Sequence, residues 1–134
     1  MQRHELLRHH RVASDCSFTL SLSFGAGRDR DELSFTEFYE YPSRPGDAGR
    51  EYSYSIYVAE RDLDRMALAW ARRCHRSTHG DPRATVLVSF QSLIRTGELG
   101  QHLAIEENVR RVRSWLVQAG IHCRDDRWSW WNTD

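Results

Sequence analysis

Residues 16–24 (CSFTLSLSF) alternate without interruption between apolar and hydroxyl-bearing side chains. One side of this segment carries Cys16, Phe18, Leu20, Leu22 and Phe24, and the other side carries only serine and threonine. Because successive side chains of a β-strand point to opposite faces, this pattern predicts a strand with one face in the core and one face in water. A chain that contains it must build a sheet.

Two further segments, 33–41 and 52–58, show the same period of two. Three consecutive strands with short connections favour an antiparallel meander. Glu37 falls on the apolar side of the second segment. An unpaired buried carboxylate is costly, so we expect Glu37 to lie near a sheet edge or to be moved outward by a bulge.

The polar side of the three predicted strands is a nearly continuous layer of short hydroxyl side chains. It consists of Ser17, Thr19, Ser21, Ser23, Ser34, Thr36, Ser53 and Ser55. Two interpretations stay open at this point. The layer is either a plain solvated face or a docking surface, since short side chains lose little entropy on burial.

After residue 60 the apolar period lengthens to that of a helix, over segments 61–75, 82 to about 96, and 105–119. Residues 86–90 also fit a short strand, but Asp81 and Pro82 form a good N-cap and first-turn pair, which favours a helix. Residues 121–131 indicate a closing strand or a small hairpin. Strands followed by helices predict an α+β fold: an antiparallel sheet of three N-terminal strands plus a C-terminal strand, with two to three helices packed on one face. We expect residues 1–14 to be a flexible N-terminal segment and residues 15–134 to form a single α+β domain.

The 134 residues include 19 basic and 19 acidic side chains, and every basic residue is arginine. A neutral chain has no global field to hold it on nucleic acid or on an anionic membrane, so we expect neither as a partner. The lack of lysine excludes Schiff-base and P-loop lysine chemistry. Residues 1–14 have no apolar core typical of a secretory signal, and the odd set Cys16, Cys74 and Cys123 is typical of a reducing compartment. We therefore expect a cytoplasmic protein.

The charges are unevenly distributed along this neutral chain. Residues 15–60 hold nine acidic residues against four arginines, whereas residues 61–134 hold twelve arginines against nine acidic residues. Acidic residues mixed with aromatic ones are typical of a surface that covers a basic site on another protein. We therefore predict a non-enzymatic protein-binding module, for example an immunity-type inhibitor of a toxin or another enzyme. Its predicted binding residues are Glu37, Phe38, Glu40, Tyr41 and Tyr57.

The catalytic and cofactor motifs CxxC, HExxH, GxSxG and GxGxxG do not occur in the sequence. We therefore assign no catalytic residue, no metal ligand and no cofactor. One alternative is a small metal-assisted hydrolase in which His75, His79, His122 and Asp125 meet in one pocket. Another alternative is a sheet-mediated homodimer with a structural role.

Three tryptophans lie close together at the end of the chain. Alternation sends Trp128 and Trp130 to one side of a strand and Trp131 to the other. Because tryptophan at this density commonly closes a small core, we expect the first two to be buried.

Overall fold

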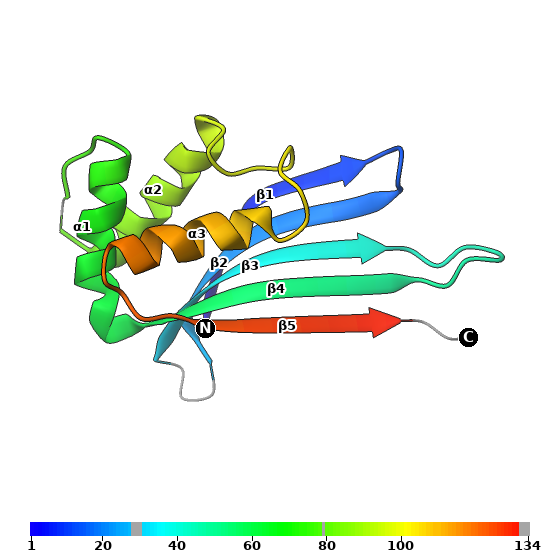
Figure 1. Ribbon diagram of the computed structural model, residues 1–134, viewed down its shortest axis with the longest axis horizontal. Helices are drawn as coiled ribbons and strands as arrows, with labels where there is room; N and C mark the ends of the chain where they lie inside the picture. The colour runs from blue at the N-terminus through cyan, green and yellow to red at the C-terminus, as the bar shows by residue number, and fades with distance from the viewer. Residues whose placement is uncertain (28–30, 79, 132–134) are drawn as a thin grey trace.

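The computed structural model describes residues 1–27, 31–78 and 80–131. The strands are β1 (Gln2–Arg11), β2 (Cys16–Ala26), β3 (Glu32–Tyr41), β4 (Arg50–Ala59) and β5 (Arg124–Trp131). The helices are α1 (Leu63–Arg73), which follows a short 3-10 turn at Glu60–Asp62, α2 (Pro82–Arg95) and α3 (Glu107–Gln118). The predicted α+β class is confirmed (Figure 1).

The five strands form one antiparallel sheet in the order β1-β2-β3-β4-β5. The chain leaves the sheet after β4, runs through the three helices, and returns to add β5 beside β4 at one edge. All three helices lie on the same face of the sheet and cover only one end of it (Figure 1). The strands continue beyond the helices toward the 12–15 and 42–49 turns, and none of the described helices lies on the opposite face.

The sheet has four N-terminal strands, one more than predicted. Residues 2–11, which we expected to belong to a flexible segment, pair with β2 as strand β1. The alternation of β1 is interrupted because the pairing register shifts between Glu5 and Leu7. Two apolar residues, Leu6 and Leu7, therefore follow each other at this point of the strand. Both leucines pack against the core. Apart from Gln2, the rest of the strand carries charged and histidine side chains, as is common at a sheet edge.

The core lies between the helices and the apolar face of the sheet. Phe35 of β3 stacks on Phe90 of α2 with ring centroids 4.9 Å apart, and Trp70 of α1 lies 5.7 Å from the same phenylalanine ring. The helical interpretation of residues after 81 is also confirmed. The Asp81 side chain accepts a hydrogen bond of 3.0 Å from the backbone N–H of Arg83 and so caps α2.

Glu37 lies neither at an edge nor at a bulge. It sits in the middle of β3, where pairing to both neighbouring strands is regular, and it is fully buried. Its carboxylate accepts hydrogen bonds from the Tyr39 hydroxyl, from the backbone N–H of Val109 at 3.3 Å and from the Asn108 side-chain amide at 3.5 Å. The first turn of α3 thus supplies donors that the sequence pattern of β3 does not reveal.

Burial raises the pKa of Glu37, and its hydrogen bonds to Tyr39, Val109 and Asn108 oppose that shift. Burial also raises the pKa of Tyr39, and the hydrogen bond to Glu37 adds to the effect. Glu37 therefore fastens α3 to the centre of the sheet, a structural role.

Candidate protein-binding surface

Strand register divides the predicted binding residues between the two faces of the sheet. Residues that pair directly across neighbouring strands point to the same face. Phe38 pairs with Ser53, Glu40 with Glu51, and Ser34 with Tyr57, so Phe38, Glu40 and Tyr57 share the face opposite the helices. We call this face the open face. Glu37 and Tyr41 point to the helix side instead.

The floor of the open face is the predicted layer of hydroxyl side chains, now seen in register across β2, β3 and β4. Ser21 pairs with Thr36, and Thr36 pairs with Ser55. The Thr36 and Ser55 hydroxyl oxygens are 2.9 Å apart and hydrogen-bonded. Several members of the layer are buried although no helix covers them. Short side chains on these three strands leave Phe38 and Tyr57 as the large side chains among them on the open face.

Acidic and aromatic side chains gather at the end of the open face that lies farthest from the helices. Glu40 and Glu51 stand directly opposite each other on β3 and β4, and Trp130 of β5 pairs with Glu51. One row closer to the helices, Phe38 and Trp128 flank Ser53. We call Phe38, Glu40, Glu51, Trp128 and Trp130 the Trp–Glu patch.

The two glutamates of the Trp–Glu patch have no salt bridge within the described part of the chain. Arg8 of β1 interacts electrostatically with Glu40, but its guanidinium bonds to Glu5 at 2.7 and 2.9 Å. Like charges directly opposite on adjacent strands are about 4.5–5.5 Å apart at their Cβ atoms and destabilise the pairing. Among the described residues, the acidic pair is therefore compensated only at longer range by Arg8 and forms no salt bridge.

The tryptophans of β5 are exposed, so the expectation that Trp128 and Trp130 close the core is wrong. Their side chains are 49% and 44% exposed. The predicted alternation does hold, because both lie on the open face and Trp131 lies on the helix side, 5.9 Å from Tyr52. The reason for the exposure is position: β5 is an edge strand, and its final residues lie beyond the end covered by helices (Figure 1).

Two predicted binding residues are engaged within the fold at other places. Tyr57 lies at the opposite end of the open face from Glu40, and the guanidinium of Arg124 stacks 4.1 Å from its ring centre. Tyr41 lies on the helix side, where Arg50 stacks on it at 4.1 Å. Only Phe38 and Glu40 of the five predicted residues therefore meet in the Trp–Glu patch. Register between β3, β4 and β5 adds the other three members.

The chain matches no protein-family model, no curated protein and no solved structure. Within residues 1–27, 31–78 and 80–131, no group of three or more histidine, cysteine, aspartate or glutamate side chains is placed to hold a metal ion. His75 and His122 therefore do not meet in such a group, and His79 lies outside the described residues. Asp125 is paired with Arg113 at 2.7 Å. None of the described helices is long and apolar enough to cross a membrane.

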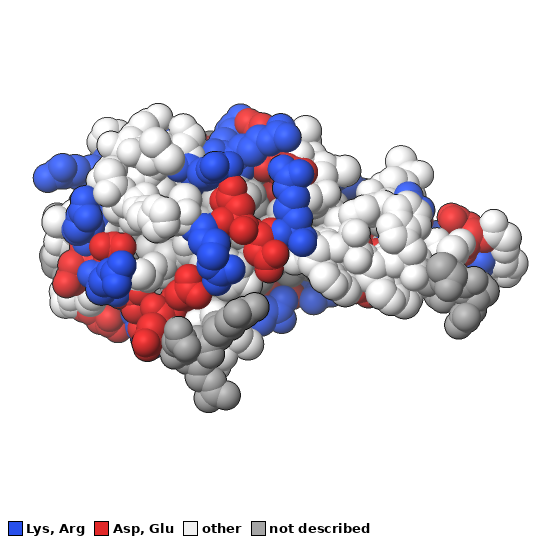
Figure 2. Space-filling model, turned by 60° about the horizontal axis from the view of Figure 1, so that its bottom comes forward, with Lys and Arg blue, Asp and Glu red and all other residues white. Residues whose placement is uncertain are grey.

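Charge is distributed unevenly over the surface. Figure 2 shows charged side chains crowded over the helices, while the part of the sheet beyond them is mostly uncharged in that view. On the helix side of that uncovered end lie Tyr41, Tyr52 and Trp131, with ring contacts of 5.9 and 6.1 Å between neighbours. The uncovered end of the sheet is thus aromatic on both faces, and the Trp–Glu patch supplies its acidic pair.

Proposed function

We propose that this chain is a non-enzymatic protein-binding module whose Trp–Glu patch docks on a basic segment of another protein. An immunity-type inhibitor, which neutralises a toxin or another enzyme by covering a basic site, is one specific form of this function. The observation that carries the proposal is the facing pair Glu40 and Glu51, which lacks a salt bridge among the described residues and stands beside two exposed tryptophans.

The acidic pair supplies the electrostatic part of the argument. Because Glu40 and Glu51 repel each other in the free protein, a cationic side chain placed between them makes two attractions that outweigh the repulsion. Rim charges of this kind act mainly on the association rate and on the choice of partner. The proposed partner segment therefore carries arginine or lysine at the position that meets the acidic pair.

The aromatic residues supply the apolar part. Tryptophan and tyrosine dominate the binding energy of many protein interfaces because a rigid ring buries a large area at little entropic cost. Trp128 and Trp130 lie on one side of the acidic pair, and Phe38 lies next to Glu40 on the same face. The short hydroxyl side chains beside them lose little entropy when a segment covers them.

A titration with extended peptides tests this siting. Peptides of alternating arginine and serine are added to the isotopically labelled protein, with glutamate–serine peptides of the same length as the charge control. We expect nuclear magnetic resonance shifts at the residues of the Trp–Glu patch, including the indole N–H groups of Trp128 and Trp130. Shifts confined to the helices, or none at millimolar peptide, would refute the proposal.

A double variant, Glu40→Gln with Glu51→Gln, removes the acidic pair without changing side-chain size. We expect it to weaken binding of the arginine peptide at least tenfold and to reduce the dependence on salt concentration. Asp64→Asn is the matched control, because Asp64 is an exposed carboxylate on α1, on the other side of the sheet. It is expected to bind like the unaltered protein.

A further inference from the structure

The two edges of the sheet differ in how well they are protected against pairing with another strand. β1 carries a register shift between Glu5 and Leu7, and Arg11 bonds to the backbone carbonyls of Gln101 and Leu103 at 2.7 and 3.3 Å. Bulges and charged side chains of this kind discourage edge-to-edge association. β5 pairs with β4 over eight residues without a register shift, and all eight are exposed.

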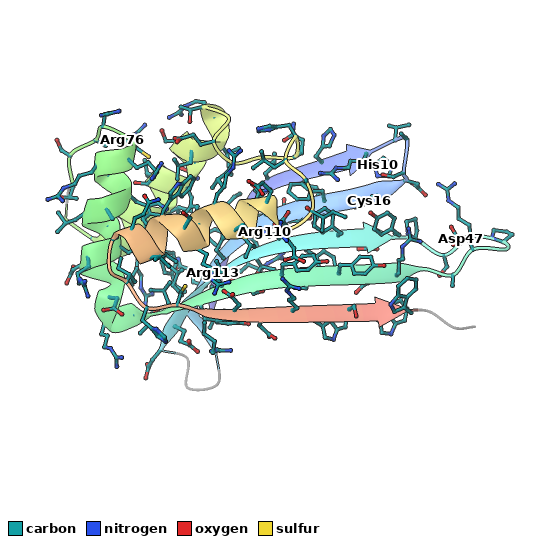
Figure 3. All side chains as sticks on the ribbon, in the orientation of Figure 1. His10, Cys16, Asp47, Arg76, Arg110 and Arg113 are labelled. Carbon is teal, nitrogen blue, oxygen red and sulfur yellow. The ribbon has the colours of Figure 1, made fainter. Side chains whose placement is uncertain are left out.

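The charged first half of β5 is tied to the rest of its own chain. Asp125 pairs with Arg113 of α3 at 2.7 Å, and Arg127 bonds to Glu106 at 2.6 Å. Figure 3 shows Arg110 and Arg113 on α3, the helix that lies over this side of the sheet. These pairs hold β5 in place and leave its uncharged second half, 128–131, as a free edge with three exposed tryptophans.

We propose that a second copy of this chain pairs with β5 along this free edge, antiparallel and about a two-fold axis at Ser129. The two sheets then become one ten-stranded sheet with both open faces on the same side. The occupant is a second copy because the edge is complementary to itself, as a two-fold interface requires.

The register follows from which side chains meet. A two-fold axis perpendicular to the sheet keeps the open faces of both copies on the same side. Because directly paired residues must point to the same face, the axis passes between one residue and the same residue of the second copy. With the axis at Ser129, Trp128 faces Trp130 of the second copy, and Arg127 faces Trp131 of the second copy, each pair occurring twice. Aromatic pairs and arginine–aromatic pairs across strands are both favourable.

Other positions of the axis are poorer. An axis at Asp126 or at Arg127 places that residue opposite its own copy, which opposes like charges. An axis at Trp128 places Asp126 opposite Trp130 and loses the arginine–aromatic pairs. Among the registers centred on residues 126–129, only the axis at Ser129 opposes no like charges and faces every tryptophan with an aromatic ring or an arginine.

The area available makes this a weak dimer. Trp128, Trp130 and Trp131 are 49%, 44% and 56% exposed. An aromatic side chain buries about 150–250 Å² when fully covered, so six half-exposed rings supply several hundred Å². Standard specific interfaces bury about 1,200–2,000 Å² in total. We therefore expect association that depends on protein concentration. It uses Trp128 and Trp130 of the Trp–Glu patch but not the acidic pair Glu40 and Glu51.

Charge variants at Ser129 test both the dimer and its axis. Ser129 is exposed and lies on the helix side of β5, outside the Trp–Glu patch, so its substitution leaves the peptide test above intact. Sedimentation equilibrium measures the average mass of the species in solution. For the unaltered protein, we expect this mass to rise with concentration from 15.8 kDa toward twice that value. Ser129→Lys and Ser129→Glu, each alone, are expected to stay at the mass of one chain.

An equimolar mixture of the two variants is expected to regain the doubled mass, because lysine then faces glutamate across the axis. Ser114→Lys, at an exposed serine on α3, is the matched control and is expected to associate like the unaltered protein. Three results would overturn the proposal: a single-chain mass at every concentration, undiminished association of the two Ser129 variants, or a mixture that does not recover.

Discussion

Glu37 offers a direct test of how the sheet and α3 are joined. Its carboxyl group is fully buried, and its pKa is raised above the ordinary value of 4.5 because burial disfavours the charged form. The folded protein therefore holds the Glu37 proton more tightly than the unfolded chain does. The stabilisation from this proton is complete below pH 4.5 and is lost as the pH rises through the folded-state pKa.

Glu37→Gln removes this titration and nearly preserves the side-chain shape. We expect the free energy of unfolding of the unaltered protein, relative to the variant, to fall as the pH rises above 4.5 and then to level off. The fall is about 1.4 kcal/mol for each unit by which the folded-state pKa exceeds the unfolded one. Urea denaturation followed by circular dichroism, between pH 4 and pH 8, measures this difference.

Glu37→Ala removes the hydrogen-bond acceptor as well as the charge. Its comparison with Glu37→Gln therefore gives the contribution of the hydrogen bonds alone. It leaves the Tyr39 hydroxyl and the Val109 N–H without their acceptor, whereas Asn108 keeps its bond to the Gly100 carbonyl at 3.0 Å. Each buried donor left without a partner costs about 1–3 kcal/mol, so the expected loss is about 2–6 kcal/mol at neutral pH.

Glu107→Gln controls for the removal of a carboxylate, because Glu107 forms a partly exposed i,i+4 pair with Arg111, a kind that contributes little. A stability difference between the unaltered protein and Glu37→Gln that stays constant from pH 4 to pH 8 would refute the reasoning. So would a loss below 1 kcal/mol for Glu37→Ala.

Three further substitutions test other parts of the fold by the same denaturation assay. Glu51→Gln relieves the repulsion with Glu40 and should stabilise the protein by about 0.2–1 kcal/mol at low salt, a gain that shrinks at high salt; a loss of stability would contradict it. Phe90→Ala removes the ring between Phe35 and Trp70 and should cost about 3–5 kcal/mol; a cost below 1 kcal/mol would place this ring outside the core. Asp81→Ala removes the cap of α2 and should cost about 0.5–2 kcal/mol, whereas no change would mean that the cap is dispensable.

Local patterns predicted the elements whose apolar side chains recur at one period along the predicted segment. The alternation of residues 16–24 became β2, and the helical spacing after residue 60 became α1, α2 and α3. β1 was missed because its register shift breaks the period of two and because an edge strand needs few apolar residues. The burial of Glu37 was missed for a different reason, since its hydrogen-bond donors come from a helix about 70 residues later in the chain.

Three of the five residues of the Trp–Glu patch depend on strand pairing that no local pattern contains. Phe38 and Glu40 were found from composition, but Glu51, Trp128 and Trp130 join them only through the register of β4 with β3 and β5. The useful signal was present in the alternation of Trp128 and Trp130, which correctly placed them on one face. Their exposure followed from where the helices end, and that depends on the whole fold.

The structure also changes what the uneven charge of the chain means. Part of the acidic excess in the strands is matched internally by the arginine-rich later half: Glu32 pairs with Arg124 at 2.9 Å, and Glu60 with Arg83 at 2.8 Å. Such pairs hold helices and strands of one chain together, so they do not call for a basic partner. Glu40 and Glu51 have no such match among the described residues and lie beyond the helices. The case for a basic partner therefore rests on these two carboxylates and the tryptophans beside them, rather than on the net charge of the strand region.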